Sequence, residues 1–155
     1  MGPYLTYAGD GDSTDSLPTE SQIQNQIAKL QVKNVVYGQF LSKIFDYLNN
    51  RNSPLEIRDR QILSGFIQAF SAEPDDFLAF VQAQIQVITK AKPKEGIVLV
   101  ALLFKVWKAR IDNLSLAKLS TDKRIQMLSI PDQVRKKFPT QITLSTGLSG
   151  PIFSE

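Results

Sequence analysis

The chain has 155 residues, 43% of them hydrophobic, which is enough for a folded domain with a buried core and excludes global disorder. It contains no cysteine and no histidine, so disulfides, thiolate metal sites and every catalytic triad that needs an imidazole are excluded. The net charge of +3 excludes neither a nucleic-acid nor a protein partner. We predict a protein that is not an enzyme and that needs no cofactor.

The charge is distributed unevenly along the chain. Residues 1–86 carry 6 Lys/Arg and 10 Asp/Glu, whereas residues 87–155 carry 12 Lys/Arg and 5 Asp/Glu. This asymmetry indicates an anionic partner for the second half. The alternative is a basic face that is merely solvated.

No feature of the sequence indicates export or membrane insertion. The N-terminus lacks the basic start and apolar stretch of a signal peptide. The longest apolar run, residues 97–104, is far shorter than the roughly 20 residues of a membrane span. We expect a cytoplasmic protein with no membrane partner.

The first 18 residues form an extended or loop segment by composition. A short β-like run, residues 4–7, precedes the loop-type sequence AGDGDSTDSLP. Its carboxylates could ligate a hard cation, but the spacing fails as an EF-hand loop, because Asp15 stands where glycine is needed and Ser21 where glutamate is needed. We predict no metal site in this acidic loop, residues 10–15.

The first predicted helix begins at Thr19, which has Gln22 at the spacing of a capping box. Apolar residues then recur at steps of three and four, with one longer step at Asn34, until residues 49–52 end the helix. Gly38 indicates close packing or a kink in this helix. The predicted buried stripe comprises Ile23, Ile27, Leu30, Tyr37, Leu41, Ile44 and Leu48.

Two further helices are predicted by their start signals. Ser53 caps the second, with Pro54 in its first position and Glu56 closing the box. The third begins at residues 73–76, where Asp75 and Asp76 suit the positive end of a helix better than a catalytic role, and it ends at Pro93.

The segment GIVLVALLFKVWKARI, residues 96–111, is the predicted central helix. A buried strand is the alternative, but the apolar pattern continues through Val106, Trp107 and Ile111, and this length favours a helix. The larger aromatic side chains fall in the apolar stripes and are predicted to be core rather than a base-stacking platform. They are Phe66, Phe70, Phe77, Phe80, Phe104 and Trp107.

The last part of the chain carries weaker signals. Residues 120–122 cap a shorter helix, residues 131–138 can form one or two more turns, and residues 140–145 alternate like a strand. We therefore predict an all-α protein, a bundle of four to five helices over residues 19–138 with extended segments at both termini, residues 1–18 and 139–155.

Basic residues of the second half form the candidate nucleic-acid site. Several fall in predicted loops and caps, where flexible side chains can reach phosphates without reading bases. No zinc finger, helix-turn-helix or RNP motif is visible, so binding should be independent of sequence. The candidate residues are Lys90, Lys92, Lys94, Lys105, Lys108, Arg110, Lys118, Lys123, Arg124, Arg135, Lys136 and Lys137.

One short motif resembles a known family. Tyr7-Ala8-Gly9-Asp10-Gly11-Asp12 resembles the hairpin of palm-type cyclases and polymerases, which reads Tyr-Ala-Gly-Gly-Asp-Asp in the large subunits of CRISPR effector complexes. Those subunits end in a helical domain similar to the separate small subunits, and in the type I-D branch a small subunit is made from an internal start. The resemblance implies a small subunit whose partners are guide RNA or target DNA backbone and other subunits, including copies of itself.

The motif also departs from the family pattern. Gly11 and Asp12 stand where two adjacent carboxylates are expected, and no palm sheet precedes Tyr4. The resemblance therefore implies no cyclase activity. The alternative hypothesis is a helical protein–protein adaptor or regulatory bundle without nucleic-acid contact.

Replacing Asp10 and Asp12 with Asn should leave folding and partner binding nearly unchanged, because the chain lacks the sheet that would align the two carboxylates on metals. Thermal unfolding and binding of the double variant test this expectation. Loss of a nucleotide-dependent activity in that variant would contradict the prediction of a non-enzyme.

Overall fold

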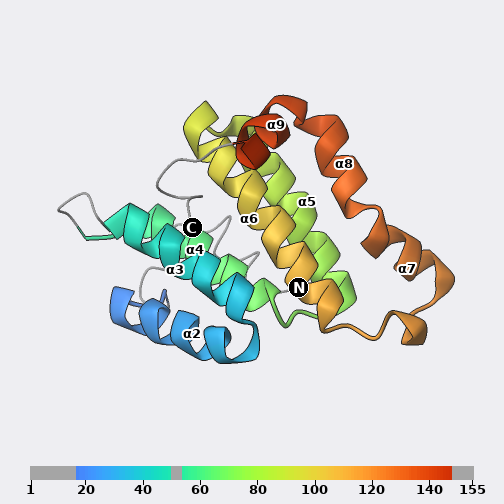
Figure 1. Cartoon of the computed structure of the whole chain (residues 1–155), viewed down its shortest axis with the longest axis horizontal. Coiled ribbons are helices and arrows are strands. Elements are labelled where there is room, and N and C mark those ends of the chain that lie inside the picture. The colour runs from blue at the N-terminus through green and yellow to red at the C-terminus, as the bar shows by residue number, and fades with distance from the viewer. Residues whose placement is uncertain (1–16, 50–53, 148–155) are drawn as a thin grey trace. The chain divides into compact units, whose positions relative to one another are not determined.

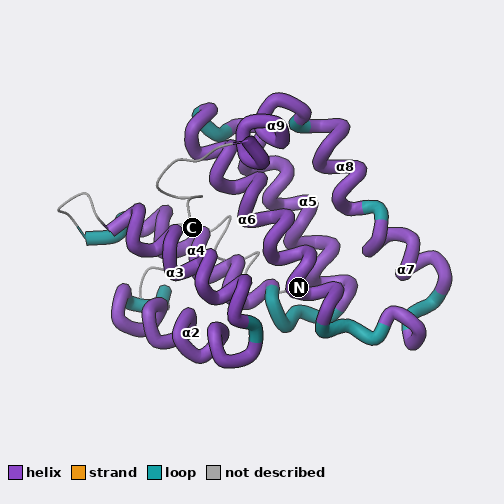
Figure 2. The backbone as a smooth tube through the Cα atoms, in the orientation of Figure 1, coloured by secondary structure: helices purple, strands orange, loops and turns teal. Residues whose placement is uncertain are grey.

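The computed structural model describes residues 17–49 and 54–147, and every regular element in these ranges is helical (Figures 1 and 2). The prediction of an all-α protein is confirmed, although the described residues hold more helices than the four to five predicted. These residues divide into two compact units. Unit 1 contains the described residues up to Ala69, and unit 2 those from Phe70 onward.

Unit 1 consists of α2 (Glu20–Lys33), α3 (Val35–Asn49) and α4 (Ile57–Ala69), which pack on one another. The predicted capping box starts α2: the Gln22 amide donates to Thr19 Oγ1 at 3.1 Å, and the Thr19 amide donates to Gln22 Oε1 at 2.9 Å. Two short-range hydrogen bonds thus satisfy amides that the first helical turn leaves without backbone partners.

The single helix predicted across Asn34 is wrong, because the chain breaks there into α2 and α3. Asn34 adopts an extended backbone conformation, and its side-chain Oδ1 accepts a hydrogen bond from the Tyr37 amide at 3.0 Å. Asparagine competes for backbone groups in this way and so favours helix ends over helix interiors. The longer step in the apolar stripe at Asn34 marks this break.

Close packing at Gly38, one of the two alternatives predicted, fixes the corner between α2 and α3. A Cβ atom on Gly38 would lie 2.4 Å from Gln31 Cγ and 2.5 Å from Gln31 Cα. These distances are too short for any side chain, and one of the two obstructing atoms belongs to the backbone. The two helices can therefore approach this closely only if residue 38 is glycine.

The core of unit 1 is apolar apart from one buried phenol. The Tyr37 hydroxyl donates to the Phe66 carbonyl oxygen at 2.8 Å, which ties α3 to α4. Burial raises the pKa of Tyr37 well above its ordinary value, so the phenol keeps its proton and remains a donor at neutral pH. Other core residues are Ile23, Ile27, Leu30, Leu41, Ile44 and Leu63.

Helix α4 begins at Ile57, three residues later than the start predicted from Pro54; Ser53 lies outside the described residues. The Leu55 side chain is buried, and its amide donates to Glu20 Oε2 on α2 at 2.7 Å. The first backbone hydrogen bond of the helix runs from the Arg60 amide to the Glu56 carbonyl. A contact with α2, which lies far away in sequence, thus holds residues 54–56 outside the helix.

Unit 2 contains α5 (Pro74–Lys90), α6 (Pro93–Asp112), the 3-10 turn η2 (Leu116–Lys118), α7 (Thr121–Leu128), α8 (Ile130–Lys137) and α9 (Pro139–Gly147). The predicted starts at Pro74 and Ser120 are confirmed, and Ser120 Oγ accepts a hydrogen bond from the Lys123 amide at 3.2 Å. Helix α5 already ends at Lys90, and Pro93 occupies the first turn of α6.

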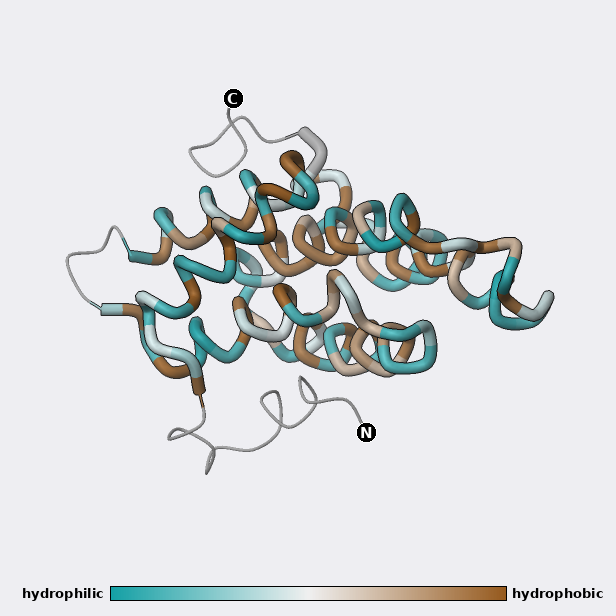
Figure 3. Tube along the Cα trace, turned by 90° about the horizontal axis from the view of Figure 1, so that it is seen from below, coloured by the Kyte–Doolittle hydropathy of each residue, from teal (hydrophilic) through white to brown (hydrophobic). Residues whose placement is uncertain are grey.

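Helix α6 is the central element of unit 2, as predicted. Residues 99–103 are all buried, and because successive helical residues are rotated by about 100°, these five residues cover the whole circumference. Helices α5, α8 and α9 each pack on α6. Figure 3 shows hydrophobic residues, in brown, recurring along the helices between hydrophilic ones, in teal.

Most of the larger aromatic side chains are core, as predicted. Phe66, Phe70, Phe77 and Phe80 are buried, whereas Phe104 and Trp107 on α6 are half-buried. The Trp107 indole donates to the Met127 carbonyl oxygen at 2.8 Å, which joins α6 to α7. The indole nitrogen therefore has a structural hydrogen bond.

The strand predicted over residues 140–145 is wrong, and the C-terminal segment is helical as far as Gly147. Pro139 opens α9, and the Ile142 amide donates to the Phe138 carbonyl at 3.0 Å. Packing on α6 and α8 overrides the weak β-propensity of the alternating sequence. A lone strand here would leave its backbone groups without partners, and a helix satisfies them internally.

The Gly38→Ala variant should lose about 1–3 kcal/mol of unfolding free energy, because overpacking against the Gln31 backbone outweighs the helix propensity of alanine. Gly96→Ala is the matched control. Its Cβ would lie 3.8 Å from the nearest atom, so it should be neutral or stabilising by up to about 1 kcal/mol. Urea unfolding measures both, and equal effects of the two changes would contradict the close approach at Gly38.

Candidate nucleic-acid interface

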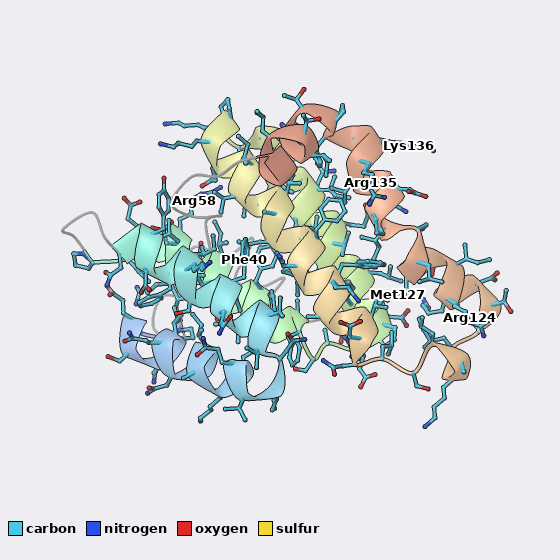
Figure 4. The ribbon with its side chains drawn as sticks, in the orientation of Figure 1. Phe40, Arg58, Arg124, Met127, Arg135 and Lys136 are labelled. Atoms are coloured by element: carbon cyan, nitrogen blue, oxygen red, sulfur yellow. The ribbon has the colours of Figure 1, made fainter. Side chains whose placement is uncertain are left out.

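All twelve predicted basic residues lie in unit 2, but the structure does not bring them together. One group lies where α5, α6 and α9 meet, and another lies where α5 begins and α6 ends (Figure 1). Lys105 is exposed in the middle of α6, between the two groups. In Figure 4, Arg135 and Lys136 lie on α8, and Arg124 lies at the opposite end of the unit.

The first group, which we call the basic end, comprises Lys90, Lys92, Lys94, Arg135, Lys136 and Lys137. A Cβ placed on Gly96 would lie 3.8 Å from Gln141 Cγ and 4.0 Å from Ile88 Cγ2, so three helix ends converge there. Lys90, Lys92 and Lys94 lie between Ile88 and Gly96 in the sequence. The remaining basic residues, 135–137, lie in the last turn of α8, directly before α9.

The basic side chains at this end are exposed and mostly without acidic neighbours. Arg135 forms an exposed pair with Asp132 at 3.3 Å, and its guanidinium lies 5.5 Å from the centroid of the Phe104 ring. The structure gives the five lysines of the basic end no ion pair with another described residue. Glu95 and Asp132 are the acidic residues in segments 86–98 and 129–147, so the basic end has a positive net charge.

Helix stability accounts for part of this charge but not for all of it. Lys90 lies in the last turn of α5, and the three residues of α8 lie in its last turn, where the helix dipole favours cations. Lys92 and Lys94 lie instead at the N-cap and in the first turn of α6, where the same dipole disfavours them. These two lysines therefore call for an explanation outside the fold, such as an anionic partner.

The second group, which we call the paired end, comprises Lys108, Arg110, Lys118, Lys123 and Arg124. Arg110 Nε donates to the Ala72 carbonyl oxygen at 2.8 Å and so ties the end of α6 to the residues before α5. Burial lowers the pKa of Arg110 from its ordinary value, and the nearby Glu73 carboxylate partly offsets this effect. Arg110 is thus a structural residue.

The other members of the paired end also have internal partners, except Lys118, whose side chain has none among the described residues. Arg124 donates to the carbonyls of Leu116 and Leu119 at 3.2 and 3.0 Å and holds η2 against α7. Lys123 pairs with Asp75, and Lys108 pairs with Asp112 at 2.8 Å. The sequence identified these residues as basic, but their pairing with distant carbonyls and carboxylates could not be seen in it.

An open cleft of about 330 Å³ lies at the paired end, between the first turn of α5 and the η2–α7 segment. Its charged lining residues are Glu73, Asp75, Lys118 and Lys123. Two acidic and two basic side chains balance, so the cleft does not attract an anion by net charge.

Two further types of site find no support in the described part of the chain. No group of three or more acidic side chains there is close enough to hold a metal ion, and the acidic loop of residues 10–15 lies outside that part. Likewise, none of the helices in the described ranges is long and apolar enough to span a membrane.

Comparisons with known proteins give no match. A scan against protein-family models finds none that matches, and searches of curated proteins and of solved structures also find no match.

Replacing Arg110 with Met should lower the unfolding free energy by about 1–2 kcal/mol, because the half-buried side chain loses its hydrogen bond to Ala72 while most of its apolar stem is kept. The triple change Lys90→Ala, Lys92→Ala and Lys94→Ala should change the unfolding free energy by no more than roughly 0.5 kcal/mol for each substitution. Urea unfolding distinguishes the two variants. An unchanged midpoint for Arg110→Met would show that Arg110 is not structural.

Proposed function

We propose that this chain is a non-catalytic small subunit of a cytoplasmic, RNA-guided CRISPR effector complex in antiviral defence, and that it binds nucleic-acid backbone through the basic end. The observation that carries the proposal is the position of Lys92 and Lys94, which the fold does not favour. Together with the other four basic side chains they form an exposed, positively charged surface on a helical scaffold.

The chemistry of the basic end suits phosphates rather than bases. Long, flexible lysine side chains neutralise phosphate charge without reading base edges. The neighbouring aromatic rings are unavailable for stacking, because Phe138 is buried and Phe104 is half-buried with Arg135 over its ring. In an RNA-guided complex, base pairing supplies the specificity, and the protein supplies charge and shape.

Membership of an effector complex is supported by the motif at residues 7–12 and by the all-helical fold. A non-catalytic role is supported by the absence of histidine and cysteine from the sequence and by the position of Asp75, which pairs with Lys123. The other subunits of the complex, including further copies of this chain, are the proposed protein partners.

A second function, a protein–protein adaptor without nucleic-acid contact, has one observation in its favour. Val32, Val35 and Val36 are exposed within a five-residue stretch at the corner between α2 and α3. Such apolar surface is typical of protein interfaces. The two functions differ in what they predict for binding at different salt concentrations.

Binding of a mixed-sequence single strand should weaken steeply with salt, with a log–log slope of about −0.7 for each phosphate contacted. Changing Lys90, Lys92 and Lys94 to Ala should reduce the magnitude of that slope by up to about 2, and so should changing Arg135, Lys136 and Lys137. Fluorescence anisotropy over a salt series measures both.

The matched control is the triple change of Lys105, Lys108 and Lys118 to Ala, which removes the same charge from unit 2 outside the basic end. A second control changes Lys29, Lys33 and Lys43, which lie in unit 1. Both controls should change the slope less. If the two basic-end variants keep the wild-type slope, alone and in the assembled complex, the adaptor function is the better account.

A further inference from the structure

Exposed aliphatic side chains gather at two places in the described residues. The first, which we call the valine corner, is formed by Val32, Val35 and Val36, whose side chains are 86%, 58% and 66% exposed. Val32 lies in the last turn of α2 and the other two in the first turn of α3. β-branched residues have no advantage on an exposed helix surface, so helix formation does not account for them.

The valine corner is bordered by positive charge. Lys29 precedes Val32 by one helical turn, Lys33 follows it directly, and both lysines are exposed. The sequence from residue 21 to residue 45 contains no Asp or Glu. A surface that covers the corner should therefore be apolar with an acidic border.

The second place lies on α7 and has this complementary character. Ile125 and Leu128 are 59% and 46% exposed, and Asp122 is exposed one turn before Ile125. The spacing of three residues puts them on one side of the helix, which we call the α7 ridge. Met127 is fully buried and anchors the other side of α7.

Asp122 is the charged residue on the α7 ridge, and the two basic residues that follow it in the sequence are held by other partners. Lys123 pairs with Asp75, and the Arg124 guanidinium donates to two backbone carbonyls. Asp122 has no ion pair with another described residue, so its carboxylate is available to Lys29 or Lys33 of another molecule.

We infer that the valine corner of one copy of this chain binds the α7 ridge of a second copy. The contact buries five exposed aliphatic side chains and places Asp122 opposite Lys29 and Lys33. The contact joins two different surfaces, so it can be made twice in a closed dimer or continue through further copies. The surfaces are small, so the association is weak and depends on concentration.

Sedimentation velocity over a concentration series tests the contact. The average mass of the wild-type chain should rise with concentration above that of a monomer. A corner variant (Val32→Gln, Val35→Gln, Val36→Gln) and a ridge variant (Ile125→Gln, Leu128→Gln) should each associate roughly tenfold more weakly or not at all. Ile57→Gln, at an aliphatic residue that is 46% exposed outside both surfaces, should behave as wild type.

A mixture of the two variants gives the sharpest result. The ridge of the corner variant and the corner of the ridge variant are both intact, so the mixture should form a one-to-one dimer and grow no further. Changing Lys29 and Lys33 to Glu should also weaken association, and Asp122→Lys in the same chain should restore it. Circular dichroism confirms that each variant is folded.

Two results would overturn the inference: a wild-type chain that stays monomeric at every concentration, or a mixture in which the two variants do not pair. The inference does not depend on nucleic-acid binding. Both association variants should keep the wild-type salt slope, and the basic-end variants should keep wild-type self-association, so either proposal can fail alone.

Discussion

The burial of α6 on all sides is the constraint on which unit 2 depends. Five consecutive buried residues, 99–103, leave this stretch of the helix no face that could remain in water, so other helices must cover it. Helices α5, α8 and α9 cover it. Residues 139–147 form the helix α9, rather than the predicted strand, where they pack on α6. Because α5 and α6 run in opposite directions, the packing of helices on α6 also determines which segments meet at each end of unit 2.

The two ends use their basic residues differently. At the paired end, Arg110 and Arg124 donate to backbone carbonyls and Lys123 meets Asp75, so positive charge there holds the connecting segments in place. At the basic end, Lys92 and Lys94 oppose the dipole of the helix that carries them. Residues that the fold does not favour are good candidates for function, because side chains that disfavour the local structure occur most often at functional sites.

The features predicted correctly are those whose causes lie within a few residues. The box of Thr19 and Gln22, the cap at Ser120 and the start at Pro74 are local signals, and the structure confirms each of them. The length of the apolar pattern through Trp107 likewise predicted α6 as a helix.

The features that were missed depend on contacts distant in sequence. The late start of α4 follows from the Leu55–Glu20 hydrogen bond, and the helical state of α9 follows from packing on α6 and α8. For the candidate site, the sequence identified the basic residues but not their division between two ends. That division depends on which carbonyls and carboxylates the fold brings near each side chain, as at Arg110 and Ala72.

Protection of individual lysines from acetylation, measured by mass spectrometry with and without a mixed-sequence RNA at low salt, tests most directly whether the basic end binds nucleic acid. RNA should protect Lys90, Lys92, Lys94, Lys136 and Lys137, and should leave Lys108 and Lys118 of the paired end reactive. Equal protection of both ends, or none at the basic end, would contradict the assignment of nucleic-acid binding to this surface.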